Sequence, residues 1–136
     1  MEPSLLSLIK TYVPSQLYVN ENGVITRYLK YDVSKGNITL MFSLFSENGI
    51  WGGAISLFMC STWGMGHPLT LDDAKFSTLE DCMADLWNYL ELRVSLNEAF
   101  NNSKVIKFIK SERKKWDSIP SNEKINYLKI NSDLEF

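Results

Sequence analysis

Histidine and cysteine are scarce in this sequence of 136 residues, which contains one histidine and two cysteines. Cys60 and Cys82 lack the C-x-x-C spacing of a zinc site, and two cysteines do not make a disulfide framework. His67 and the adjacent pair Asp72 and Asp73 add no metal-ligand spacing, because an Asp pair ahead of a helix is typical of turns and caps. The sequence therefore predicts no metal site and no cofactor.

A strong excess of one charge is also missing. The chain has 14 lysines and arginines against 16 aspartates and glutamates, a formal net charge of -2. Nucleic-acid-binding proteins usually carry a basic excess, and a mimic of DNA would need a dense acidic surface. With 45% hydrophobic and 22% charged residues, the composition is that of a globular protein. We expect one domain over residues 1–136, in which residues 118–136 could form a peripheral C-terminal arm.

Long hydrophobic runs are absent as well. No stretch approaches the roughly 20 apolar residues that cross a bilayer. Residues 1–16 have an acidic second position and apolar positions interrupted by serine and lysine, unlike a secretory signal. The sequence therefore predicts a cytoplasmic protein without a membrane span.

A β-meander is predicted in the first half of the chain, after a short helix over residues 3–13 that Pro14 ends. Short turns rich in Asn, Ser and Gly separate runs of β-branched and aromatic residues, as in antiparallel hairpins. The predicted strands cover residues 16–19, 24–33, 38–45 and 50–60. Gly52 and Gly53, inside the fourth run, indicate a bulge or a close approach of another backbone segment.

Both faces of the third and fourth predicted strands carry apolar side chains. A sheet with one face in water should alternate more cleanly between apolar and polar residues. We therefore expect the second face to be covered, either by helices or by a partner chain, which could be a second copy in a homodimer.

Helices are predicted after the strands. Residues 77–93 carry one apolar stripe, and Ser77 with Glu80 forms an S-x-x-E capping box. Residues 101–116 place apolar side chains on one side and lysines on the other, and residues near 123–130 are expected to form either a third, short helix or an ordered arm. The predicted fold class is α+β, with a four-stranded antiparallel meander preceded by a short helix and followed by two or three helices.

Catalysis is one possible function of the segment that joins the meander to the first of these helices, STWGMGHPLTLDD. Histidine is the side chain most often used as a general base, and His67 could act in this way with a carboxylate such as Asp72. No nucleophile motif surrounds it, and Gly64 and Gly66 lack the third glycine and the βαβ context of a dinucleotide site. A His-dependent enzyme is the least favoured function, and a His67 bound to backbone beside Pro68 is the simpler interpretation.

A protein-contact loop is the favoured functional interpretation of the same segment. Trp63 lies between two glycine-rich points, and exposed tryptophan is a frequent anchor of protein interfaces. The alternative is that Trp63 folds back over the end of the sheet. The predicted partner-binding residues are Trp51, Trp63, Met65 and His67.

A lysine face on the last long helix offers a second function. Several lysines on one side of a helix would bind phosphate groups with a salt-dependent, sequence-independent affinity. A solvated helix face is the plainer interpretation. The residues are Lys104, Lys107, Lys110, Lys114 and Lys115.

A pattern of small residues and caps runs from residue 61 to residue 90. A strand runs into a Gly-rich turn, then a proline and a small loop, and then an F-S-T-x-E sequence that opens a helix. The residues are Gly64, Gly66, Pro68, Phe76, Ser77, Thr78 and Glu80. This pattern resembles small accessory domains of phage, plasmid and other mobile-element proteins. The resemblance gives no catalytic residue, and it implies an accessory protein that binds another macromolecule.

The favoured function is therefore non-enzymatic binding to another protein of unknown identity. Its most concrete form is a phage or mobile-element inhibitor of a host defence complex or nuclease, and this form rests on the resemblance. The alternative function is an accessory role in nucleic-acid binding through the lysine face.

Overall fold

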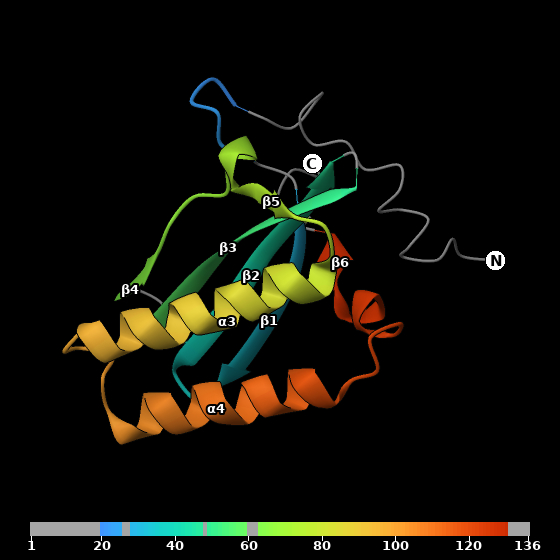
Figure 1. Cartoon of the computed structure of the whole chain (residues 1–136). Helices are drawn as coiled ribbons and strands as arrows, with labels where there is room; N and C mark the ends of the chain where they lie inside the picture. Colours follow the sequence, from blue (N-terminus) through green and yellow to red (C-terminus); the bar gives the residue numbers. More distant parts are fainter. Residues whose placement is uncertain (1–19, 26–27, 48, 60–62, 131–136) are drawn as a thin grey trace.

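The fold is α+β, with one antiparallel sheet and two long helices, in the computed structural model of the chain (Figure 1). The structure describes residues 20–25, 28–47, 49–59 and 63–130. The strands are β1 (Leu29–Lys35), β2 (Ile38–Glu47), β3 (Ile50–Met59), β4 (Trp63–Gly66), β5 (Ala74–Phe76) and β6 (Lys129–Ile130). The helices are α3 (Leu79–Leu96) and α4 (Ser103–Ser118), with short 3-10 turns η1 (Leu71–Asp73) and η2 (Lys124–Tyr127).

The sheet is an antiparallel meander in the order β4-β3-β2-β1-β6, with β5 added beside β3. β2 and β3 form its centre, and their pairing runs from Ile38 with Met59 to Glu47 with Ile50. The outer side of β3 is shared between two short strands, because β4 pairs with its C-terminal half and β5 with its N-terminal end. Within the described residues, β4 and β5 therefore lie along one edge of the sheet, and β6 forms the other.

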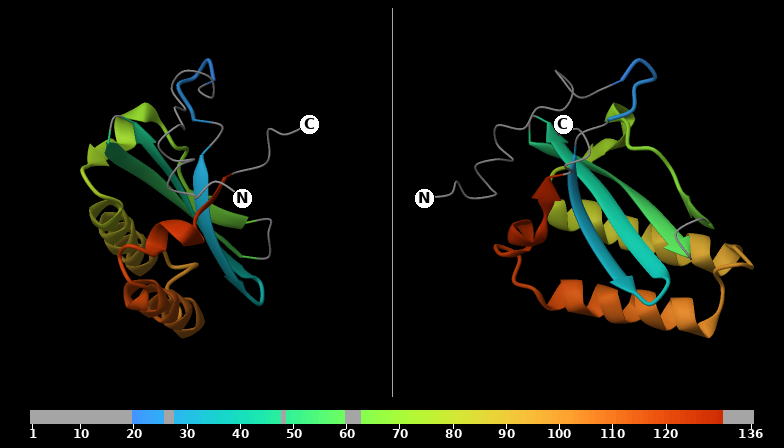
Figure 2. Two further views of the ribbon diagram at one scale, coloured as in Figure 1. Left: turned by 90° about the vertical axis from the view of Figure 1, so that its right-hand side faces the viewer. Right: turned by 180° about the vertical axis from the view of Figure 1, so that it is seen from behind.

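One face of the sheet packs against both helices and forms the main core. Figure 2 shows the strands in front of α3 and α4 when the molecule is seen from behind. The Phe42 ring of β2 lies 5.9 Å from the Tyr31 ring and 4.6 Å from the Trp87 ring, measured between centroids. Tyr31 in turn lies 4.7 Å from Trp116 of α4. This chain of aromatic rings joins the sheet to both helices.

The opposite face of the sheet is covered at one end by loop residues. The side chains that form this second, smaller core are Ile25, Phe45, Ala54 and Leu69. The Ile25 N–H donates to the Leu69 carbonyl at 2.7 Å, and Val24 forms a β-bridge with Thr70. At this end, the apolar second face is thus buried by two segments of the same chain rather than by helices.

Each long helix begins at a side-chain cap. The Thr78 hydroxyl accepts from the Asp81 N–H at 3.0 Å and caps α3, while Asn102 caps α4 in the same way through Val105. The prediction that Ser77 and Glu80 form the cap of the first helix was wrong by one residue. Glu80 instead forms an ion pair with Lys124 of the C-terminal segment. The Lys124 Nζ atom lies 2.8 Å from the Glu80 Oε1 atom.

The predicted strands and the observed strands differ at the ends of the meander. The expected helix over 3–13 and the expected strand over 16–19 lie outside the described residues. The next strand begins at Leu29 rather than at residue 24. β4 and β5 were not predicted, and the segment near 123–130 forms the four-residue 3-10 helix η2 followed by β6. The described part of the expected C-terminal arm therefore adds a strand to the sheet, beside β1.

Gly52 marks the close backbone approach that the sequence predicted at the Gly52–Gly53 pair, whereas Gly53 lies against side chains. A Cβ atom on Gly52 would lie 2.6 Å from the carbonyl carbon and oxygen of Asp73, just before β5. The β3–β5 register also shifts between Trp51 and Gly52. A Cβ atom on Gly53 would meet the end of the Leu86 side chain, also at 2.6 Å. The missing side chains therefore let β5 and α3 pack tightly on β3.

Candidate functional site

The predicted contact loop contains the edge strand β4. Gly64 pairs with Phe58 and Gly66 with Ser56 of β3. A Cβ atom on Gly64 would lie 2.5 Å from the Leu57 carbonyl oxygen and 2.6 Å from the Phe58 ring. The glycines of this segment are explained by close strand pairing, because Phe58 occupies the space of a side chain at position 64.

Among the predicted partner-binding residues, Met65 and His67 lie together at the edge of the sheet. Met65 is half-buried and packs against the main core. The Nδ1 atom of His67 lies 3.2 Å from the Pro68 carbonyl oxygen, the backbone contact that the simpler interpretation expected. The His67 ring also meets the Tyr89 ring of α3 edge-on, with 5.8 Å between centroids. His67 thus connects the end of β4 to the outer side of α3.

The two tryptophans of the prediction differ in position. Trp51 lies on β3 in the main core with only 9% of its surface exposed, so its ring stabilises the fold rather than facing a partner in this structure. The backbone of Trp63 pairs with Met59 in β4. The Trp63 side chain lies outside the described residues, and its contact role stays a prediction.

An exposed apolar stripe on α3 continues the surface that begins at β4. Tyr89, Leu92 and Leu96 are 37%, 57% and 73% exposed. Their spacing of three and four residues places them on one side of the helix, away from the side that meets α4. Arg93 lies in the same stripe, and its guanidinium carbon is 5.9 Å from the centroid of the Tyr89 ring.

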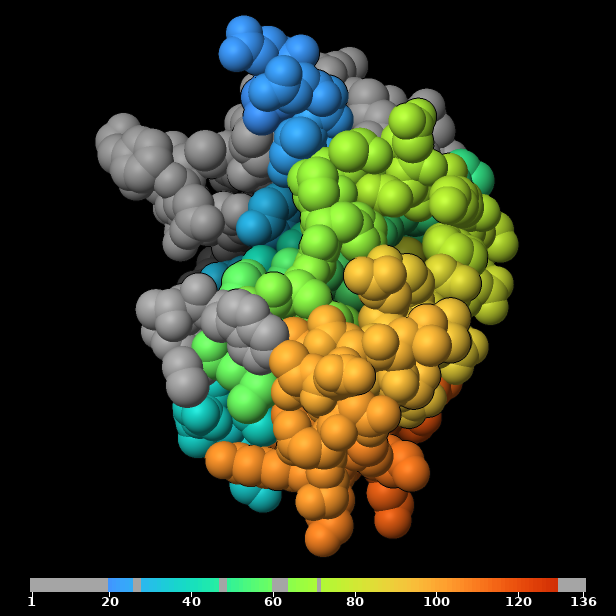
Figure 3. All heavy atoms as spheres, turned by 90° about the vertical axis from the view of Figure 1, so that its left-hand side faces the viewer, coloured from blue at the N-terminus to red at the C-terminus, as the bar shows by residue number. Residues whose placement is uncertain are grey.

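We call this region the α3–β4 surface. Its residues are Met65, His67, Tyr89, Leu92, Arg93 and Leu96. In Figure 3, β4 (green) and the C-terminal half of α3 (yellow to orange) face the viewer and lie side by side. At the end of α3 the surface is hollowed by a shallow depression of about 460 Å³, lined by Arg93, Leu96 and residues 97–99. The stripe of α3 is the part of this surface that sequence reasoning missed.

The two carboxylates near His67 in the sequence belong to Asp72 and Asp73, and that of Asp73 stabilises the local turn. The Asp73 carboxylate accepts a hydrogen bond of 2.9 Å from the Thr70 N–H, which holds η1 against the loop. Asp72 is exposed. In the described part of the chain, no hydrogen bond or ion pair joins His67 to either carboxylate. The arrangement therefore provides no oriented His–Asp pair for acid–base chemistry.

The predicted lysine face is divided between two hollows and open surface. Lys104, Lys107 and Lys115 line a groove of about 300 Å³ between α4 and the β1–β2 hairpin. Lys35, from the end of β1, lines the same groove and was missed by the sequence analysis. Lys110 lines a separate hollow between α3 and α4. Lys114 is exposed and lines neither of these hollows.

Burial changes the acidity of two core side chains. Burial raises the pKa of the Cys82 thiol to about 12, with smaller contributions from the carboxylates of Asp85 and Asp73. Burial, with a contribution from Glu112, also raises the pKa of Tyr31 to about 12. A thiol held neutral in the core behaves as a small apolar side chain, not as a nucleophile.

No group of three or more His, Cys, Asp and Glu side chains able to hold a metal ion occurs among the described residues. No helix in the described ranges is long and apolar enough to cross a membrane. Comparisons of the chain with protein-family models, with curated proteins and with solved structures found no match. The functional proposal therefore rests on the geometry and the sequence of the chain itself.

Proposed function

We propose that the chain is a non-enzymatic binding domain that docks on another protein through the α3–β4 surface. The observation that carries the proposal is the exposed stripe of Tyr89, Leu92 and Leu96, which are three of the six large hydrophobic residues exposed in the described structure. Exposed apolar residues gathered on one face, rather than scattered singly, are typical of interaction sites.

The chemistry of this surface supports a protein partner. Interface anchors are enriched in tyrosine and arginine, and Tyr89 and Arg93 lie together in the stripe. Leu92 and Leu96, which are 57% and 73% exposed, supply apolar area that a partner would remove from water. Met65 adds an adaptable side chain beside them. A partner that covers this surface would therefore gain affinity mainly from two leucines and one aromatic ring.

The rigidity of the surface supports the same function. Tyr89 is fixed on an 18-residue helix, and His67 is held against it by its ring contact and by the Pro68 carbonyl. A surface on rigid elements binds with a small loss of conformational entropy. The resemblance of residues 61–90 to accessory domains of mobile-element proteins suggests the partner class, namely a host nuclease or defence complex that the domain would inhibit by contact.

A pair of matched variants tests the proposal. The tagged chain is used to capture proteins from a lysate of the cells in which it occurs, and the retained proteins are identified by mass spectrometry. Leu92→Asp/Leu96→Asp introduces two charges in the α3–β4 surface. Ile50→Asp/Tyr127→Asp makes the same change at two exposed hydrophobic residues outside it.

We expect the wild type and the Ile50/Tyr127 variant to retain the same protein, and the Leu92/Leu96 variant to retain at least tenfold less of it. Circular dichroism checks that each variant is folded. Equal retention by all three proteins would contradict the proposal. If the retained partner is a second copy of the chain, a light-scattering mass of twice the monomer will identify it, and the Leu92/Leu96 variant will be monomeric.

A further inference from the structure

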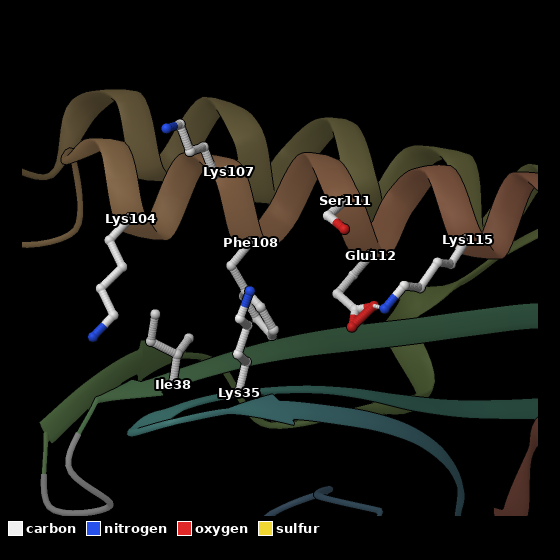
Figure 4. A pocket seen from close by; sticks show the side chains of 8 residues that line it. All are labelled: Lys35, Ile38, Lys104, Lys107, Phe108, Ser111, Glu112 and Lys115. Atoms are coloured by element: carbon white, nitrogen blue, oxygen red, sulfur yellow. Dashed lines mark ion pairs between the residues drawn. The ribbon is translucent and has the colours of Figure 1, made fainter.

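The groove between α4 and the β1–β2 hairpin gathers positive charge from two separate elements. Its lining includes Lys104, Lys107 and Lys115 of α4 and Lys35 of β1. Figure 4 shows Lys35 pointing up toward α4 while Lys104 points down toward the hairpin, so the two ammonium groups face the space between the elements. Lys107 points away from the sheet in the same view. The groove is thus assembled by the fold and is not simply one side of a helix.

One carboxylate accompanies the four ammonium groups of the groove. Glu112 is largely buried, and its Oε2 atom lies 3.6 Å from the Lys115 Nζ atom, at the end drawn with a dashed line in Figure 4. Among the described residues, no other acidic side chain lines the groove. The groove is therefore net positive although the chain has a net charge of -2. A ligand that fits this charge is an anion.

The length of the groove favours an anion with several charges in a row. The helix rises about 17 Å between Lys104 and Lys115, at about 1.5 Å per residue, which is longer than a single phosphate group. Phe108 and Ile38 form the floor and are almost completely buried, so the groove offers no exposed ring on which a base could stack. Recognition here would depend on phosphate charge and not on base identity.

We infer that this groove binds a row of phosphate groups, supplied by a nucleic-acid strand or by a free oligophosphate. Lys35 and Lys104 hold the ligand from opposite walls, and Lys107 extends the positive rim. Glu112 holds Lys115 at one end and reduces the positive charge there. The groove lies on the hairpin side of α4, whereas the α3–β4 surface lies on the side of α3 away from α4. Phosphate binding therefore does not depend on the proposed protein-docking function.

The test measures binding of a fluorescent twelve-nucleotide oligo-dT by anisotropy and of inorganic tripolyphosphate by calorimetry, both with the full chain at low salt. We compare Lys35→Glu/Lys104→Glu, which reverses two charges inside the groove, with Lys110→Glu/Lys114→Glu, which reverses two charges on the same helix outside it. We expect the first pair to lose at least tenfold in affinity and the second pair to lose much less. For the oligonucleotide, three or four phosphate contacts predict a plot of log affinity against log salt with a slope of about -2 to -3.

Two further variants distinguish an effect of charge on binding from an effect of misfolding. Lys35→Arg/Lys104→Arg should keep the affinity, because the positive charge is preserved. Glu112→Gln should raise it several-fold, because Lys115 is released and a repelling carboxylate is removed. Binding of the oligonucleotide alone would identify a nucleic-acid strand as the ligand, and equal binding of tripolyphosphate would identify the phosphate row itself. No binding of either probe at low salt, or equal losses in the two charge-reversed pairs, would overturn the inference.

Discussion

At the scale of single residues, glycine positions decide how closely the layers of this protein approach. Gly52 faces backbone atoms of Asp73 and Ala74, whereas Gly53 faces the ends of the Leu86 and Leu44 side chains. Backbone atoms cannot move aside without breaking the β3–β5 pairing, but side-chain ends can change their rotamers. The two neighbouring glycines should therefore differ in their tolerance of a methyl group.

We predict that Gly52→Ala lowers the free energy of unfolding by about 1–3 kcal/mol, the usual cost of overpacking a core. Gly53→Ala should have a smaller effect because its contacts are flexible. Urea denaturation followed by circular dichroism measures both. A larger loss of stability for Gly53→Ala than for Gly52→Ala would show that the close approach of the β5 backbone is not what requires glycine in this part of β3.

Cys82 provides a second prediction at this scale, through the pH dependence of stability. Its pKa is raised from 9.0 to about 12 in the folded protein, so the native thiol keeps its proton while the unfolded thiol ionises. The free energy of unfolding should therefore fall as the pH rises above about 9, and continue to fall toward pH 12. Below pH 9 the thiol should make no pH-dependent contribution.

The measurement compares Cys60→Ser with Cys60→Ser/Cys82→Ala, so that the first protein keeps Cys82 as its only thiol. We expect the protein with Cys82 to lose more stability between pH 8 and pH 10.5 than the protein without it. The native thiol should also react very slowly with a thiol reagent at pH 8. Rapid reaction under native conditions would contradict the buried position of Cys82.

At the scale of secondary-structure elements, the sequence predicted the long elements well. β2, β3, α3 and α4 lie close to the predicted ranges, because each has many residues in a clear alternating or helical pattern. β4 and β5 have four and three residues. Strands this short carry no readable alternation, and their pairing depends on the edge that β3 offers to them. The sequence pattern therefore could not reveal them.

The cap of α3 gives a prediction for this scale. Thr78, not Ser77, accepts the hydrogen bond from the first turn of the helix. Thr78→Ala should lower the free energy of unfolding by about 1 kcal/mol, and Ser77→Ala should change it by only a few tenths. Thermal or urea unfolding of the two variants distinguishes them. A larger loss of stability for Ser77→Ala than for Thr78→Ala would show that Ser77 is the cap, as the sequence predicted.

At the scale of the whole molecule, the C-terminal segment is tied to the first long helix by a buried cation. Lys124 is only 4% exposed, and its ammonium group lies 2.8 Å from Glu80 and 5.5 Å from the centroid of the Trp116 ring. An unpaired buried ammonium is costly, but the Glu80 side chain is 44% exposed, so the pair is intermediate between a buried and an exposed ion pair. This contact joins positions far apart in the sequence, which is why no local pattern predicted it.

We expect Glu80→Ala to lower the free energy of unfolding by about 1–3 kcal/mol, between the values for exposed and buried pairs. The double variant Glu80→Ala/Lys124→Met should recover part of this loss, because the unpaired ammonium is then gone. A double-mutant cycle from urea unfolding measures the coupling. If the losses of stability from the two single substitutions add up to that of the double variant, the two side chains do not interact directly.

The candidate contact surface was predicted only in part for a related reason. The sequence singled out Met65 and His67 through their unusual glycine-rich segment. It did not single out Tyr89 and Leu92, and it placed Leu96 beyond the predicted end of the helix at residue 93. The helix runs on to Leu96, and only tertiary packing brings its outer side beside β4. Trp51 was selected because its residue type is common at interfaces, but its depth in the core depends on the fold.

Site-specific cross-linking tests the docking surface most directly. A photoreactive benzoylphenylalanine is placed at Leu92, in the α3–β4 surface, or at Lys114, on the outer side of α4, and the cells that contain the chain are irradiated. We predict one discrete covalent adduct from position 92, formed with a partner protein or with a second copy of the chain, and none from position 114. No adduct from position 92, or the same adducts from both positions, would contradict docking through this surface.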